Sequence, residues 1–190
     1  TESATFSGSD NLQNVISRVT GGEISNIDGL LRSEISNADF FFINPAGVVF
    51  GENAVVDVPA AFHVSTADGL NFADGSLFSA SSPETSTLSM AAPESLGFLS
   101  AQSSSIELNG VLLEFKADSK VSISSGDITL QGPDALVSSL DGEIRFSAMG
   151  TATGDVSVTN LDEFATAADG ELIMDSVGVM TRGYNGGGHI

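Results

Sequence analysis

Cysteine and tryptophan are absent from the 190-residue sequence, and lysine and arginine together number only six. A chain without cysteine has neither disulfide bonds nor thiolate ligands for a metal. Its two histidines are too few for an ordinary zinc site. Six cations against 25 acids give a formal net charge of −19, which disfavours binding to DNA, to RNA or to an anionic membrane surface.

Long hydrophobic runs are missing as well. The sequence has no stretch of 18 apolar residues, and its amino terminus lacks a basic segment followed by an apolar one. We therefore expect neither a membrane-spanning helix nor a signal peptide within this sequence. Hydrophobic residues still make up 41% of the chain, which is enough for the packed core of one domain.

The hydrophobic residues occur in short clusters separated by Gly, Ser, Thr, Asn and Asp, a pattern typical of strands joined by turns. Residues 40–43 are apolar at successive positions, which predicts a strand covered on both faces. Only residues 11–19 have apolar side chains at helical spacing, and we expect a short helix there. The remainder predicts an all-β fold.

Four segments in the second half of the chain share one pattern: glycine, an acid, an aliphatic residue, any residue and an apolar residue. They begin at Gly126, Gly142, Gly154 and Gly170. A strand this short buries its apolar face only by stacking on a neighbour, which is how a solenoid is built. A β-sandwich is the alternative. The repeat favours the solenoid, with roughly 20–25 residues in each coil and about eight coils.

The solenoid interpretation also predicts a core and an interruption. Residues 79–95 are rich in Ser, Thr, Pro and Ala, and we expect a loop or an extra-helical excursion there. The side chains expected to stack inside the coil include Phe41, Ile43, Val49, Val56, Phe62, Ile128, Ile144 and Val156.

Few residue patterns indicate catalysis or metal binding. His63, Ser65 and Asp68 are too close in sequence for a hydrolase triad and lack a nucleophile elbow. The acids of the four repeats occupy equivalent positions, which is typical of solvated strand starts rather than of a glycosidase or lyase pair. No calcium-loop motif is present in the sequence. We assign no catalytic residue, no metal ligand and no cofactor.

The segment Asn44-Pro45-Ala46-Gly47 separates two apolar stretches and predicts a β-turn. Pro45 suits the second turn position and Gly47 the fourth, whereas Ala46 at the third disfavours a type II turn and favours type I. The side-chain oxygen of Asn44 can accept backbone N–H groups and close the turn. Two roles remain open: the turn directs folding of a coil corner, or it contacts a partner.

Two segments around this turn resemble a known family. They are residues 14–31, NVISRVTGGEISNIDGLL, and residues 38–51, ADFFFINPAGVVFG. Both are similar to the filamentous-haemagglutinin-type secretion domain of two-partner secretion exoproteins. The motif of that family is Asn-Pro-Asn-Gly, and Ala46 takes the place of its second asparagine here. The resemblance implies a right-handed parallel β-helix with small extra-helical β elements, forming a single secretion domain over residues 1–190.

The resemblance implies a function too. Such a domain lies at the amino end of a larger exoprotein and targets it to an outer-membrane β-barrel transporter through that partner's periplasmic domains. The domain then nucleates β-helix folding at the surface of a Gram-negative-type bacterium. Residues 44–47 would be the secretion motif. We expect a monomer that is not an enzyme and that binds no nucleic acid or small-molecule cofactor.

Composition fits passage of an unfolded chain through a narrow pore, because cross-links are absent and like charges oppose aggregation. An adhesin surface on the same β-helix and a halophilic structural domain stay open as alternatives, and a polysaccharide-active enzyme is the least favoured. The activity of the rest of the exoprotein, whether adhesin, haemolysin or toxin, is not fixed by this sequence.

Overall fold

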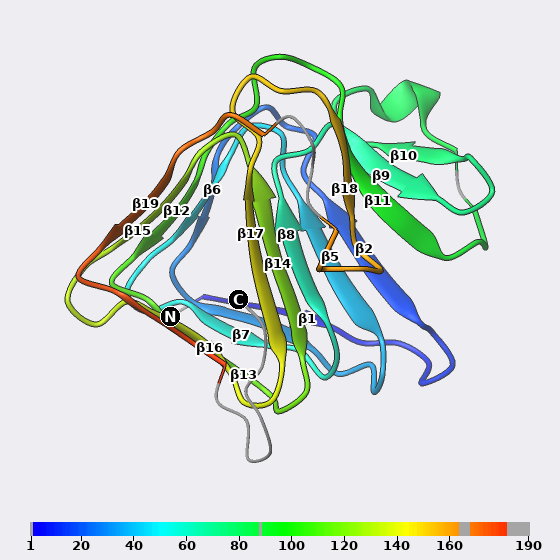
Figure 1. The fold of residues 1–190 in the computed structure, drawn as a ribbon. Coiled ribbons are helices and arrows are strands. Elements are labelled where there is room, and N and C mark those ends of the chain that lie inside the picture. Colours follow the sequence, from blue (N-terminus) through cyan, green and yellow to red (C-terminus); the bar gives the residue numbers. More distant parts are fainter. Residues whose placement is uncertain (1, 88, 164–167, 182–190) are drawn as a thin grey trace.

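The computed structural model describes residues 2–87, 89–163 and 168–181, which consist almost entirely of strands and turns. Most strands stack in parallel into a coil of about six turns with three sides (Figure 1). The described residues contain one short 3₁₀ helix, Pro83–Thr85, and no α-helix. The prediction of an all-β fold built as a parallel β-helix is therefore confirmed.

Each turn of the coil contributes one strand to each side. The first side contains β2 (Asn14–Arg18), β5 (Asp39–Ile43), β8 (Phe62–Ser65), β14 (Lys120–Ser125) and β17 (Glu143–Ala148). The second side contains β3 (Ser25–Ile27), β6 (Val48–Phe50), β12 (Ile106–Asn109), β15 (Ile128–Gln131) and β19 (Leu172–Asp175). The third side contains β1 (Ser3–Phe6), β4 (Leu30–Ser33), β7 (Val55–Asp57), β13 (Leu112–Phe115), β16 (Leu136–Ser139) and β20 (Gly178–Met180).

The length of one coil is close to the predicted value. Where the coil is uninterrupted, paired residues of neighbouring strands lie 22 to 27 positions apart, as in Phe40 with Phe62. Two insertions break this spacing, because Val48 pairs with Ile106 and Ile128 pairs with Leu172. The residues used in these insertions explain why the chain forms about six turns and not the eight expected from its length.

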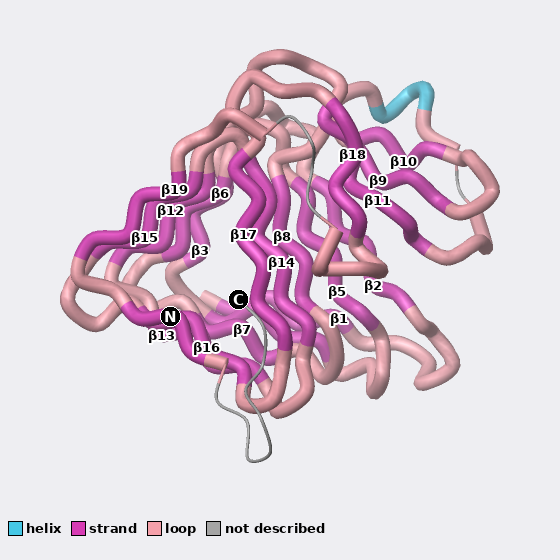
Figure 2. Tube along the Cα trace, viewed as in Figure 1, coloured by secondary structure: helices cyan, strands magenta, loops and turns pink. Residues whose placement is uncertain are grey.

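The insertions build a second, antiparallel sheet outside the coil, seen at the right of Figure 2. Its strands are β9 (Gly69–Phe72), β10 (Leu77–Ser79), β11 (Pro93–Phe98) and β18 (Gly154–Ser157), in the order β10-β9-β11-β18. Residues 79–95 run from the end of β10 through the 3₁₀ helix into β11. The first insertion thus supplies three strands of this extra-helical sheet, and the second supplies β18.

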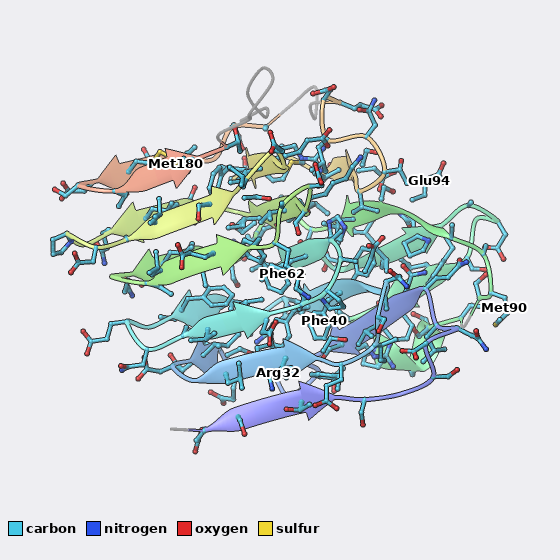
Figure 3. The ribbon with its side chains drawn as sticks, turned by 90° about the horizontal axis from the view of Figure 1, so that it is seen from below. Arg32, Phe40, Phe62, Met90, Glu94 and Met180 are labelled. Carbon is cyan, nitrogen blue, oxygen red and sulfur yellow. The ribbon has the colours of Figure 1, made fainter. Side chains whose placement is uncertain are left out.

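The apolar side chains form two cores on opposite faces of the first side. The core inside the coil includes stacked rings of Phe40 and Phe62, whose centroids are 6.2 Å apart (Figure 3). The second core lies between the first side and the extra-helical sheet and contains Phe41 and Leu96. Strand β5 contributes to both cores, so the prediction of a strand covered on both faces is confirmed.

This division corrects part of the predicted core. Val56, Phe62, Ile128 and Ile144 are buried inside the coil as expected. Phe41, Ile43 and Val156 are buried in the second core instead. Val49 is only half-buried, because its neighbours Val48 and Phe50 point inward and the alternation of the strand turns Val49 outward.

The prediction of a helix over residues 11–19 is wrong. Residues 14–18 form β2, which pairs in parallel with β5. Val15 packs against the core of the coil, whereas Ile16 packs against the second core. A strand with both faces covered carries apolar residues at successive positions, and here these positions imitate the spacing of an amphipathic helix.

The four glycine-acid-aliphatic segments each contain a strand, but these strands do not occupy equivalent positions in successive coils. Strands β15 and β19 stack directly on the second side, and β17 belongs to the first side. Strand β18 belongs to the extra-helical sheet and pairs with β11 in the antiparallel sense. The expectation that these segments are successive stacked strands therefore holds only for β15 and β19.

Two arginines of the first side attach the extra-helical residues to the coil. Arg18 lies 4.2 Å from the centroid of the Phe78 ring and donates hydrogen bonds to the Ser79 carbonyl and to Ser86 Oγ. Arg145 is 4% exposed and donates hydrogen bonds to the carbonyl groups of Ser157, Asn160 and Glu163. Arg18 is on β2 and Arg145 on β17, so the two contacts hold opposite ends of the extra-helical part.

We expect Arg18→Met to lower the free energy of unfolding by about 1–3 kcal/mol, because hydrogen bonds from a charged donor and a cation–π contact are lost. The change should also speed proteolysis within residues 77–87. The matched control is Arg32→Met, which removes a half-exposed ion pair with Asp57 at 2.8 Å and should cost less than about 1 kcal/mol. Urea titrations of both variants test this, and equal losses would contradict the assigned role of Arg18.

Candidate functional site

The segment 44–47 forms a tight turn at the corner between β5 and β6. The backbone N–H of Gly47 donates to the Asn44 carbonyl at 3.1 Å, and the N–H of Ala46 donates to Asn44 Oδ1 at 2.9 Å. Ala46 is not among the residues with positive φ, which agrees with a type I turn and excludes type II.

Asn44 connects three successive coils. Its side-chain Nδ2 donates to the Glu23 carbonyl at 2.9 Å and to Ser25 Oγ at 2.8 Å, both in the preceding coil. Its backbone N–H donates to the Ser65 carbonyl of the following coil at 2.9 Å. The residue is completely buried. We call residues 44–47 together with Glu23, Ser25 and Ser65 the Asn44 corner.

Gly47 completes the corner in a conformation that suits glycine. Its φ is +117°, and a Cβ atom added there would lie 3.3 Å from the Ser105 carbonyl oxygen. The Gly47 carbonyl accepts from the Ser25 N–H at 3.1 Å, which continues the hydrogen bonds of the second side. Asn44 and Gly47 are both buried, and Pro45 and Ala46 are half-buried. The turn at residues 44–47 therefore exposes only parts of Pro45 and Ala46 to a partner.

His63 is a buried residue on β8, next to the core shared with the extra-helical sheet. Its ring stacks on Phe41 with centroids 4.5 Å apart, and its Nδ1 lies 2.7 Å from Ser122 Oγ. Burial lowers the pKa of His63 to about 3, and the positive charges of Arg145 and Lys120 act in the same direction. His63 is therefore neutral at physiological pH.

The other residues considered for catalysis do not converge. Ser65 Oγ accepts from the Ala67 N–H, and Asp68 Oδ2 accepts from the N–H groups of Leu99 and Ser100, so neither bonds to His63. Of the repeat acids, Asp127, Asp155 and Glu171 are exposed, and Glu143 lies 3.4 Å from the ammonium group of Lys120. Among residues 2–87, 89–163 and 168–181, no three His, Asp or Glu side chains gather as a metal site.

Comparison with protein families identifies the family to which this chain belongs. A model of the TPS secretion domain matches residues 1–178, nearly the whole chain. The chain belongs to the TPS secretion domain family. No curated protein and no solved structure matches it significantly.

Membership in this family places the TPS domain in two-partner secretion. The family serves to direct a secreted exoprotein across the outer membrane, together with an outer-membrane transporter as its partner. It is a family of secretion and targeting domains and is not known for enzymatic activity. In the described part of the chain, no helix has the length and apolarity needed to cross a membrane.

Sequence reasoning located the turn of the TPS domain but missed the residues that hold it. Glu23 and Ser25 precede Asn44 by about one coil, and Ser65 follows it by about one coil. A coil length of 22 to 27 residues, read together with the turn, is the signal that could have found them. The polar contact between His63 and Ser122 spans an insertion, and no such spacing signals it.

The low pKa of His63 predicts a pH-dependent stability of the TPS domain. Because the folded pKa of about 3 is below the ordinary histidine pKa of 6.5, the neutral histidine contributes stability that is complete above pH 6.5. This stability falls as the pH decreases from 6.5 towards 3, by about 1.4 kcal/mol for each pH unit. Between pH 7.5 and pH 5, wild type should therefore lose about 2 kcal/mol more than His63→Gln. Urea titrations at both pH values test this, and parallel losses would show that His63 is not responsible.

Proposed function

We propose that this chain is the amino-terminal secretion domain of a larger exoprotein. It targets the exoprotein to an outer-membrane β-barrel transporter through the transporter's periplasmic domains, and it nucleates folding of the β-helix at the cell surface. In this role the domain acts as a monomer, and the Asn44 corner acts in folding of the coil rather than as a contact with the transporter.

The observation that carries the folding role is the set of hydrogen bonds around Asn44. One buried side chain satisfies the Ala46 N–H, the Glu23 carbonyl and Ser25 Oγ, and its backbone N–H bonds to Ser65. The bonds to Glu23, Ser25 and Ser65 form only when three coils are stacked in the correct register, whereas the Ala46 bond closes the turn itself. A corner with this property favours the first correct stack over misaligned ones, which is what nucleation of a solenoid requires.

The last described coil supports growth of the β-helix beyond the domain. Leu172 and Met174 pair with the inward-facing Ile128 and Leu130, yet they remain 45% and 43% exposed. Strand β19 is at the edge of its sheet among the described residues. Stacking of further coils of the exoprotein would bury these side chains and pair this edge.

The adhesin alternative would be favoured by aromatic side chains exposed in a groove. The large hydrophobic side chains that are exposed in the described residues are those of Leu, Ile, Val and Met. The secretion role has the support of the family, and the adhesin role has no specific observation in its favour.

A secretion experiment tests the proposal. Residues 1–190 are placed between a periplasmic signal peptide and a reporter protein, and the fusion is produced with and without the transporter. We expect the reporter in the medium or at the cell surface only when the transporter is present. A reporter that stays in the periplasm in both strains would contradict the targeting role.

A further inference from the structure

The outer face of the third side carries a row of aliphatic side chains. Leu31, Val56, Leu113 and Val137 point into the core of the coil, so the residue before each of them points outward. These outward residues are Leu30, Val55, Leu112 and Leu136, and we call them the aliphatic row. The pairs Leu30–Val55 and Leu112–Leu136 are in register, and Figure 3 shows the stacked strands that carry them. Val55 is 51% exposed and Leu112 is 48% exposed.

The middle of this row is hollowed. The third side is divided into two three-stranded sheets, β1-β4-β7 and β13-β16-β20, because β7 and β13 are neighbours without ladder hydrogen bonds. A hollow of about 300 Å³ lies at this division, with Val55 and Leu112 among its lining residues. The same hollow is lined by Glu52 and Glu114.

These two glutamates are exposed carboxylates without a cation beside them. The described residues contain two ion pairs, Arg32 with Asp57 and Lys120 with Glu143, and neither involves Glu52 or Glu114. The hollow thus combines aliphatic walls with two acids whose charge is not neutralised. A lysine or arginine side chain has matching chemistry, since its stem is apolar and its head is a cationic hydrogen-bond donor.

We propose that the hollow between β7 and β13 receives a lysine or arginine side chain from the periplasmic domains of the transporter. The stem of that side chain packs on Val55 and Leu112, and its head lies between the carboxylates of Glu52 and Glu114. The aliphatic row on either side packs against the transporter segment that carries the cation. This inference rests on the proposed targeting function, for which it names a docking surface.

Charge complementarity favours a basic segment of the transporter over a second copy of this chain as the occupant of the hollow. The formal net charge of −19 repels a second copy of the chain and attracts a basic surface. Exposed acids at the hollow increase the rate of encounter with such a surface and fix its orientation. Asn44, in contrast, is completely buried and offers no comparable contact.

The test uses the folded domain and the purified periplasmic part of the transporter. Glu52→Gln/Glu114→Gln keeps the shape of both side chains and removes two charges. We expect at least a tenfold weaker affinity, a shallower dependence of the affinity on NaCl concentration and an unchanged melting temperature. Leu112→Lys should weaken binding to a similar extent, because it places the chain's own ammonium group beside the two carboxylates.

The matched control is Glu94→Gln/Glu171→Gln, which removes two exposed charges away from the hollow and should change the affinity less than threefold. Equal weakening by both double variants would show that only the net charge matters and would overturn the inference. Wild-type affinity in Glu52→Gln/Glu114→Gln would overturn it as well. Absence of binding by the folded wild-type domain would also overturn the inference, whereas failure of transporter-dependent secretion of the reporter would contradict transporter targeting itself.

Discussion

Ile144→Asp should lower the free energy of unfolding by at least about 4 kcal/mol, the largest effect we expect from a single substitution. Ile144 is 2% exposed in the core of the coil, where it pairs with Val121. The substitution removes a packed aliphatic side chain and leaves a carboxylate without a partner in an apolar interior. Urea or thermal unfolding of the purified domain measures the effect.

A matched substitution tests whether the loss of stability comes from burial of the aspartate or from the change of isoleucine to aspartate itself. Ile173→Asp makes the same change at a side chain that is 47% exposed on the outer face of the second side, and it should cost less than about 1 kcal/mol. If Ile144→Asp does not fold at all, the milder Ile144→Ala should still cost about 2–4 kcal/mol. Equal stability of the two aspartate variants would show that the core of the coil is wrongly assigned.

Asn44→Ala should lower the free energy of unfolding by about 2–4 kcal/mol and should also reduce secretion. The substitution removes the acceptor of the Ala46 N–H and the donor to the Glu23 carbonyl and Ser25 Oγ, and this loss occurs at a completely buried position. If the corner acts through folding, transporter-dependent secretion should decrease together with stability.

The control keeps Asn44 and changes another residue of the Asn44 corner. Ala46→Asn introduces the residue that is usual in the family motif at a half-buried position, and it should leave both stability and secretion near wild type. Thermal unfolding and transporter affinity are measured on the same Asn44→Ala protein. Unchanged stability combined with lost binding would assign the corner to docking and would reject the folding role.

The β-helix was predictable because its pattern is local. Short apolar segments, turn residues and a repeat within the length of one coil are all visible in the sequence. The side to which a strand belongs was not predictable. The segment at Gly154 has the same pattern as the segment at Gly170, yet Val156 pairs with Leu96 in the extra-helical sheet. Alternation of apolar and polar residues indicates that one face of a strand is covered, but it does not indicate which part of the protein covers that face.

The candidate site was also predictable only in its local part. The turn at residues 44–47 follows from the preferences of Asn, Pro and Gly at turn positions. The partners of the Asn44 side chain lie one coil away, and their position depends on the register of stacked strands. The burial of His63 depends on an extra-helical sheet whose strands come from two separate insertions. Such contacts between distant segments exist only once the tertiary structure has formed.

The long interval between β6 and β12 has a consequence for the order of assembly. Up to β8, each strand finds its partner within about one coil, so contact order is low and pairing can follow the arrival of the chain. The next pairings join more distant segments, because Val48 pairs with Ile106 and Phe62 pairs with Val121. These pairs form only after the intervening residues have been added. The added loop-closure entropy is small, about 0.6 kcal/mol for a doubling of loop length, so the interval affects the timing of folding far more than the final stability.

Strands β9, β10 and β11 can pair among themselves during this interval. The edges of β6 and β8 meanwhile stay open, which makes this the stage of folding at which wrong strand pairing is most easily made.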